Sequence, residues 1–141
     1  MTERISPLVS VVMGVYNGAG SLAATVDSVL SQQDCDFEFV IVNDGSTDNT
    51  GALLNEYAKR DERVRVLHQE NTGLTRALIS GCAAARGEFI ARQDAGDVSL
   101  AARLAVQAEF LSSRPDVVLT CTACRVVGPR DEELFDIVRD G

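Results

Sequence analysis

Two aspartates stand three positions apart in the segment RQDAGDV, residues 92–98. They follow the apolar run Phe89-Ile90-Ala91 and precede a stretch with helical periodicity. A carboxylate pair at the end of a strand could hold a divalent cation between phosphate oxygens, because Mg²⁺ and Mn²⁺ prefer oxygen ligands. Alternatively, the second acid could cap the helix that follows, where the helix dipole favours a negative charge. The spacing alone leaves both interpretations open.

The loops after the other apolar runs are also polar and contain glycine. YNGAGS begins at Tyr16, NDGSTDNT at Asn43 and QENTG at Gln69. The glycines of the first loop match neither the dinucleotide-binding spacing nor the P-loop spacing, and no lysine follows them to reach a phosphate. We therefore expect the aromatic ring of Tyr16, rather than a glycine-rich cradle, to contact a ligand. Simple packing at a strand end is the alternative for this residue.

Apolar runs and helical patterns alternate along the chain and must position these loops. Strands are predicted at residues 8–15, 37–42, 64–68, 88–92 and 116–127, and helices at about residues 21–31, 48–60, 72–85 and 99–113, with Ser21 as the N-cap of the first helix. The short connections favour strand–helix–strand units with parallel strands. The predicted fold class is α/β, with a doubly wound, mostly parallel sheet and helices on both faces. Ligands bind at the carboxyl ends of such strands, where the polar loops lie.

Composition limits the possible partners. The 141 residues fit one domain, and the shares of hydrophobic (45%) and charged (24%) residues are those of a globular protein. A net charge of -8 and a single lysine, Lys59, argue against nucleic acid or an anionic membrane as the main partner, because such binding needs clustered cations. No apolar stretch approaches the roughly 20 residues of a transmembrane segment. We expect a cytoplasmic protein.

The four cysteines do not form a recognisable zinc motif. Cys121 and Cys124 lie in a β-branched stretch, where positions three apart point to opposite faces of a strand. No second cysteine or histidine pair could complete a site, and the only histidine, His68, stands alone. We expect these two cysteines, together with Cys35 and Cys82, to be buried structural thiols.

The segments PLVSVVMGVYNG, FEFVIVNDGSTDNT and ENTGLTRALISGCAAARGEFIARQDAGD closely resemble the N-terminal nucleotide-binding half of the family 2 glycosyltransferases. The resemblance runs from about Pro7 to about Leu111, with the motifs in the order and spacing of the family. It implies the Rossmann-like GT-A fold and an inverting enzyme, which transfers a sugar from a nucleotide-diphosphate donor to an acceptor hydroxyl. The acceptor, whether saccharide, lipid or protein, is left open, and so is homo-oligomerisation.

Position by position, the resemblance assigns nucleotide binding to the turn after the first strand, formed by Val15, Tyr16 and Asn17. Tyr16 matches the residue that lies against the nucleobase. Asp44 matches the acid that binds the base edge, where a carboxylate accepts a hydrogen bond from an imide N–H and so favours uracil over cytosine. For Asp44 the alternative is a turn, made with Ser46, that caps the following helix.

Further candidates face the same edge, Arg76 from its place on a helix and the acids from the resemblance. Arg76 could meet a phosphate, or be a solvated helix charge. Asp94 matches the first acid of the D-x-D signature, which holds ribose or metal. Many relatives read D-A-D-D, but the third position is Gly96 here, so Asp97 is the remaining acid. Asp94 and Asp97, with diphosphate oxygens and water, could still complete the octahedral shell of Mg²⁺ or Mn²⁺.

Family members use a general base in an acceptor-binding region, which would lie beyond Gly141, so the catalytic residue is unknown. The acids of RDEEL, residues 130–134, follow the last predicted strand too closely to match that region. We expect a truncated donor-binding part of an enzyme, inactive alone, with any contact to the inner face of a membrane made through missing regions. A non-catalytic nucleotide-binding or interaction module is the alternative. A phosphoacceptor receiver is disfavoured, because the acidic pair after the first strand and the lysine near the fifth are lacking.

Overall fold

The computed structural model describes residues 6–138. Its main sheet contains four parallel strands in the order β3-β2-β1-β4. The strands are β1 (Val9–Val15), β2 (Phe37–Asp44), β3 (Val64–Gln69) and β4 (Phe89–Arg92). The helices that alternate with them are α1 (Leu22–Leu30), α2 (Thr50–Arg60), α3 (Leu74–Ala84) and α4 (Arg103–Ser113). The predicted α/β class and parallel sheet are confirmed.

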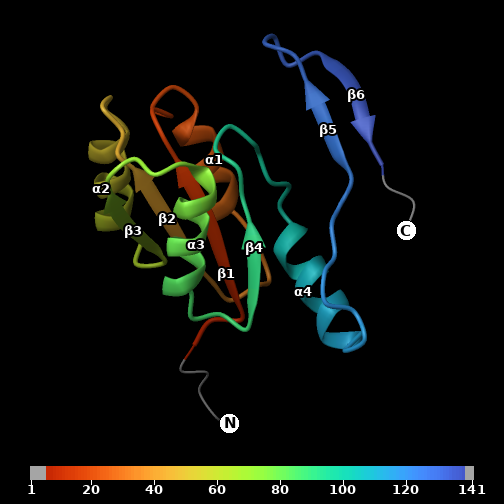
Figure 1. Cartoon of the computed structure of the whole chain (residues 1–141). Helices are drawn as coiled ribbons and strands as arrows, with labels where there is room; N and C mark the ends of the chain where they lie inside the picture. Colours follow the sequence, from red (N-terminus) through yellow and green to blue (C-terminus); the bar gives the residue numbers. More distant parts are fainter. Residues whose placement is uncertain (1–5, 139–141) are drawn as a thin grey trace.

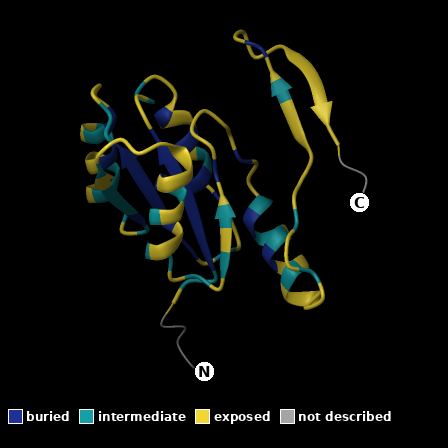
Figure 2. Ribbon diagram, in the orientation of Figure 1, coloured by how far each residue is buried: buried dark blue, intermediate teal, exposed yellow. Residues whose placement is uncertain are grey.

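Helices cover both faces of this sheet, which explains why every residue of β1 and β2 is buried. On one face, Leu22 of α1, Leu54 of α2 and Leu104 of α4 join the hydrophobic core. On the other face lies α3, where a Cβ at Gly81 would stand 2.5 Å from Cγ1 of Val12. Figure 1 shows α3 in front of β1 and β2, and Figure 2 shows these strands as the buried centre.

A buried carboxylate, Glu38, joins elements at the amino ends of the strands. Its oxygens accept hydrogen bonds from Ser10 Oγ at 2.7 Å and Arg65 Nη1 at 2.7 Å. The main-chain N–H of Arg86 donates a third bond at 2.7 Å. Burial raises the pKa of Glu38, but the hydrogen bonds outweigh burial and lower this pKa from 4.5 to about 2. This end of the sheet is therefore closed by a structural ion-pair network.

The predicted fifth strand, residues 116–127, is wrong in its extent and in its pairing. Only Cys124–Val127 forms a strand, β5, and it pairs antiparallel with β6 (Glu133–Ile137) in a separate two-stranded sheet (Figure 1). Before β5, the side chains of Val118 and Leu119 are exposed. A β-branched run favours a strand, but it does not specify which partner edge the strand will join.

Several local predictions are also wrong. Helix α4 begins at Arg103 rather than near Ser99. The predicted N-cap of α1, Ser21, is confirmed in its position, although its hydroxyl makes no capping hydrogen bond. The prediction of buried cysteines is wrong, because Cys35 is only partly buried and Cys82, Cys121 and Cys124 are exposed. The sequence around a cysteine does not reveal whether a neighbouring element covers its side chain. Within residues 6–138, no helix has the length and apolarity needed to cross a bilayer.

Candidate functional site

The carboxyl ends of the parallel strands bring four polar loops to one edge of the sheet. The pairing of β1 with β2 ends at Val15 and Asn43. The pairing of β2 with β3 ends at Asp44 and Gln69. The main-chain N–H of Gln93 donates to Val12 O at 3.0 Å, which places the end of β4 beside β1. The predicted site residues lie at this edge: Val15, Tyr16, Asn17, Asp44, Arg76, Asp94 and Asp97.

The turn after β1 gives its three predicted ligand residues different environments. Val15 is 3% exposed and packs in the core, so its main chain alone can face a ligand. Tyr16 is 52% exposed, which leaves its ring free to stack. Asn17 instead binds the loop after β2, because its Oδ1 accepts from the N–H of Thr47 at 2.8 Å and its own N–H donates to Ser46 Oγ at 3.0 Å.

Asp44 is 3% exposed, and its carboxylate binds the loop that precedes α3. Oδ1 accepts from Gln69 Nε2 at 2.7 Å and from the N–H of Thr72 at 3.0 Å, while Oδ2 accepts from the N–H of Gly73 at 2.9 Å. Burial raises the pKa of Asp44, but these hydrogen bonds outweigh it and lower the pKa. Gly73 is the N-cap of α3, whereas the first N–H of α2, that of Thr50, donates to Asp48 Oδ1 at 2.9 Å. The alternative in which Asp44 caps the following helix is therefore wrong.

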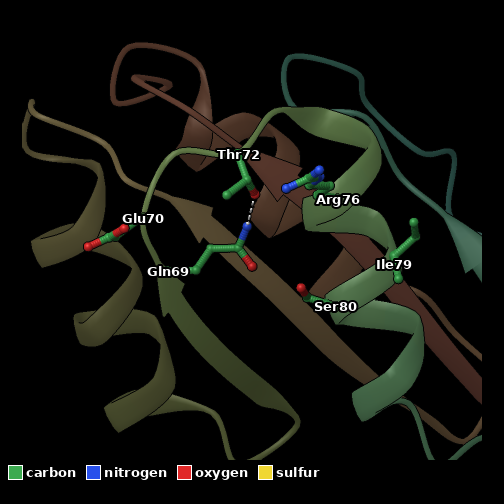
Figure 3. Close-up of a pocket in the computed structure, with 6 residues that line it drawn as sticks. All are labelled: Gln69, Glu70, Thr72, Arg76, Ile79 and Ser80. Carbon is green, nitrogen blue, oxygen red and sulfur yellow. Dashed lines mark hydrogen bonds between the residues drawn. The ribbon is translucent and has the colours of Figure 1, made fainter.

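Arg76 lies on the first turn of α3, beside this network. It is exposed and lines an open hollow of about 500 Å³, together with Gln69, Glu70, Thr72, Ile79 and Ser80 (Figure 3). Gln69 Nε2 donates to Thr72 Oγ1 at 2.8 Å, the bond drawn in Figure 3. Because the same two residues bind Asp44, the hollow adjoins the predicted base-binding carboxylate. A guanidinium here could meet a phosphate or the edge of a base.

The loop after β4 carries the two predicted metal ligands on one turn. The N–H of Asp97 donates to Asp94 O at 3.1 Å, and Gly96 between them has φ +100°. Arg92 binds both carboxylate oxygens of Asp94, at 2.8 and 3.0 Å, which raises the pKa of Arg92. Both acids are exposed. The helix-cap alternative for Asp97 is wrong, because α4 begins only at Arg103.

These acids are an incomplete ligand set for a divalent cation. Across residues 6–138, no three His, Cys, Asp or Glu side chains gather in a way that could hold a metal ion. Mg²⁺ prefers octahedral oxygen coordination. Asp94 and Asp97 therefore fit Mg²⁺ or Mn²⁺ only together with diphosphate oxygens and water, and the carboxylate of Asp94 is already paired with Arg92.

Three residues of this region were not identified from the sequence. Gln93 Nε2 donates to Asp97 O at 3.0 Å, Thr25 Oγ1 accepts from the N–H of Gly96 at 3.0 Å, and Arg103 Nη2 donates to Arg92 O at 2.8 Å. A signal was available for Gln93 alone. It continues the inward-facing alternation of β4, where a polar side chain needs buried hydrogen-bond partners.

Comparison with known proteins identifies the family. The family model described as Glycosyl transferase family 2 matches residues 10–135. The chain belongs to this family. It is similar to EpsJ, an uncharacterized glycosyltransferase of Bacillus subtilis (strain 168), with 44% identity over 91 residues. This match covers 64% of the chain but only 26% of EpsJ, so the chain spans about a quarter of that relative's length.

Two solved structures share the fold. TarS 1–349 of S. aureus, in complex with UDP-GlcNAc, matches with a TM-score of 0.70 and 25% identity, covering 76% of this chain and 32% of TarS 1–349. The mannosyltransferase PcManGT of Pyrobaculum calidifontis, in complex with GDP-Man and Mn²⁺, matches with a TM-score of 0.66 and 28% identity, covering 89% of this chain and 37% of that one. The predicted family and GT-A fold are thereby confirmed.

Proposed function

We propose that residues 1–141 form the donor-binding domain of an inverting glycosyltransferase, which moves a sugar from a nucleotide diphosphate to an acceptor hydroxyl. The observation that carries this proposal is that the same carboxyl edge of a parallel sheet carries an exposed aromatic ring, Tyr16, and an acidic turn, Asp94–Asp97. The nucleotide sugars bound to TarS and PcManGT support it. The general base for the acceptor is assigned to no residue of this chain.

The proposed donor contacts follow from exposure and charge. The ring of Tyr16 stacks on the nucleobase, with the main chain of Val15 and the Asn17 turn beside it. Asp44 Oδ2 accepts one hydrogen bond among the described residues, so it has capacity to accept another from an imide N–H. Arg76 binds a phosphate, and Asp94 binds ribose or metal.

We also propose that Mn²⁺ or Mg²⁺ binds with the donor, held by Asp94 and Asp97. Such an ion would neutralise the charge that develops on the departing diphosphate. The Mn²⁺ in the PcManGT complex supports this assignment. A cytoplasmic location is part of the proposal, supported by four cysteines that are all free thiols.

The test is nucleotide binding by the purified chain. UDP, GDP, CDP and TDP are compared by thermal shift and calorimetry, each with and without Mn²⁺, because a ligand that binds only the folded state raises the melting temperature. Tyr16→Ala should weaken binding by about 1–3 kcal/mol, the usual contribution of a stacked base. Tyr16→Phe is the matched control and should bind as the wild type does. No shift with any of the four nucleotides would refute the proposal.

A further inference from the structure

Gln93 is a buried polar residue directly beneath the acidic turn. It follows β4 and is 3% exposed, in the inward register of Phe89 and Ala91, which pack against the core. An apolar side chain would satisfy the packing at this position. A buried amide is costly unless each of its polar atoms is hydrogen-bonded, so its partners indicate what it does.

The side-chain amide of Gln93 joins the acidic turn to α4. Its Nε2 donates to the main-chain oxygens of Asp97, at 3.0 Å, and Asp94, at 3.3 Å. Its Oε1 accepts from Ser99 Oγ at 2.7 Å and from Arg103 Nη1 at 2.9 Å. This orientation of the amide is required, because carbonyl oxygens can only accept and a guanidinium can only donate. Nε2 therefore donates two hydrogen bonds and Oε1 accepts two, which satisfies the buried amide.

The same loop is held from a second side by α1. Thr25 Oγ1, which is fully buried, accepts from the N–H of Gly96 at 3.0 Å, and Ser28 Oγ accepts from the N–H of Ser99 at 3.0 Å. The loop between β4 and α4 (Figure 1) is thus held by α1 through its main chain and by Arg103 of α4 through the side chain of Gln93. The bonds from Gln93 use the main-chain oxygens of Asp94 and Asp97. They leave the exposed carboxylate of Asp97 available to a ligand.

We propose that Gln93 is a positioning residue for the divalent cation and the donor diphosphate. By binding the carbonyl groups of Asp94 and Asp97, it keeps both carboxylates on one preformed turn before the donor arrives. Gly96 supplies no third carboxylate, so the site depends on the placement of the two that remain. A turn that had to become ordered on binding would lose affinity to the entropy of ordering. This inference rests on the proposed function, since it concerns the same site.

The experiment compares two glutamine-to-methionine variants of the whole chain. Gln93→Met keeps the size of the side chain and removes its hydrogen bonds. Gln32→Met is the matched control, because Gln32 is also buried and its amide also bonds on both sides, donating to Leu100 O at 2.7 Å and accepting from the N–H of Leu104 at 3.0 Å. In the hydrogen bonds of the described residues, Gln32 contacts no atom of residues 94–97.

Calorimetry measures UDP and GDP binding across a Mn²⁺ titration. We expect Gln93→Met to raise the Mn²⁺ concentration for half-maximal nucleotide binding about 10-fold or more, the usual effect of removing a group that orients metal ligands. Gln32→Met should change this concentration by less than about twofold, because Gln32 shares no hydrogen bond with the residues that carry the carboxylates. Melting temperatures of both variants are recorded, and both are expected to fall.

The outcomes separate this inference from the proposed function. If the wild-type chain binds none of UDP, GDP, CDP and TDP, the proposed function fails. If the wild type binds but Gln93→Met keeps the wild-type Mn²⁺ requirement, or if both variants lose Mn²⁺ affinity equally, the positioning role is refuted. Should Gln93→Met not fold, Ser99→Ala replaces it, since this change removes one of the two groups bound to Oε1 of Gln93. An approximately threefold higher Mn²⁺ requirement is then expected, and no change refutes the role.

Discussion

Substituting Gly96 tests whether the acidic turn depends on its backbone conformation. Gly96 has φ +100°, a region that L-amino acids rarely adopt. A Cβ at this position would meet only Ser21 Oγ, at 3.9 Å, which is an ordinary contact. Steric overlap therefore adds nothing, and the backbone strain sets the cost at about 1–3 kcal/mol. Gly96→Ala and Gly96→Asp should lose the same stability.

Thermal unfolding measures this loss, and about 1 kcal/mol corresponds to roughly 3–4 °C in a chain of this size. The aspartate variant also creates the D-A-D-D sequence that the family resemblance implies. Its added carboxylate could supply an oxygen ligand, but a relaxing backbone would break the bond from Gly96 to Thr25 and displace the turn. We therefore expect no tighter Mn²⁺-dependent binding of UDP or GDP by Gly96→Asp than by Gly96→Ala.

The pair of variants gives a clear refutation. If Gly96→Ala melts at the wild-type temperature, the positive φ is not a requirement of the folded chain. If Gly96→Asp in addition binds nucleotide more tightly in Mn²⁺, at wild-type stability, then Gly96 marks a weakened metal site on a permissive backbone.

Two further predictions concern buried carboxylates. Glu38→Gln should cost about 3 kcal/mol of unfolding free energy at pH 7, because a pKa near 2 instead of 4.5 corresponds to about 1.4 kcal/mol per pH unit. Since this pKa is lowered on folding, the wild type should lose the same stabilisation as the pH falls from about 4.5 to about 2. Urea unfolding at pH 7 and pH 3 checks both, with about 2 kcal/mol of the stabilisation lost by pH 3. The exposed Glu56→Gln is the control and should leave stability nearly unchanged. Asp44→Asn should lower the melting temperature and weaken UDP binding about 10-fold together, because the loop before α3 loses charge-assisted hydrogen bonds. Normal UDP binding by a less stable Asp44→Asn variant would show that Asp44 only supports the fold.

The parallel strands could be predicted because each is a short apolar run followed by a polar loop. Val9–Val15 and most of Phe37–Asp44 are apolar, as expected for strands buried on both faces. The segment 116–127 has the same character, yet only its last four residues form a strand. Apolar patterning does not identify the edge that a strand will join, so neither the hairpin with β6 nor the exposure of Cys121 could be predicted.

The positions of the site loops could also be predicted, whereas the contacts of their side chains could not. Asp44 was expected to bind the base edge or to cap α2, and its bonds to main-chain groups before α3 exclude only the cap. The groups that donate to this carboxylate belong to residues 25–29 positions away in the sequence. Local patterns cannot show which of several donors will reach a carboxylate once the strands have assembled.

The polar residues of the site divide into those that join loops and those left exposed for a ligand. Asn17 joins the loops after β1 and β2, Asp44 joins β2 to the start of α3, and Gln93 closes the turn after β4. Because these bonds exist before any ligand arrives, binding would require little reorganisation and would cost less entropy. Tyr16 and Asp94 remain at the surface. Substitutions of the joining residues should therefore change affinity by disordering a loop, whereas substitution of Tyr16 should change it with the loops intact.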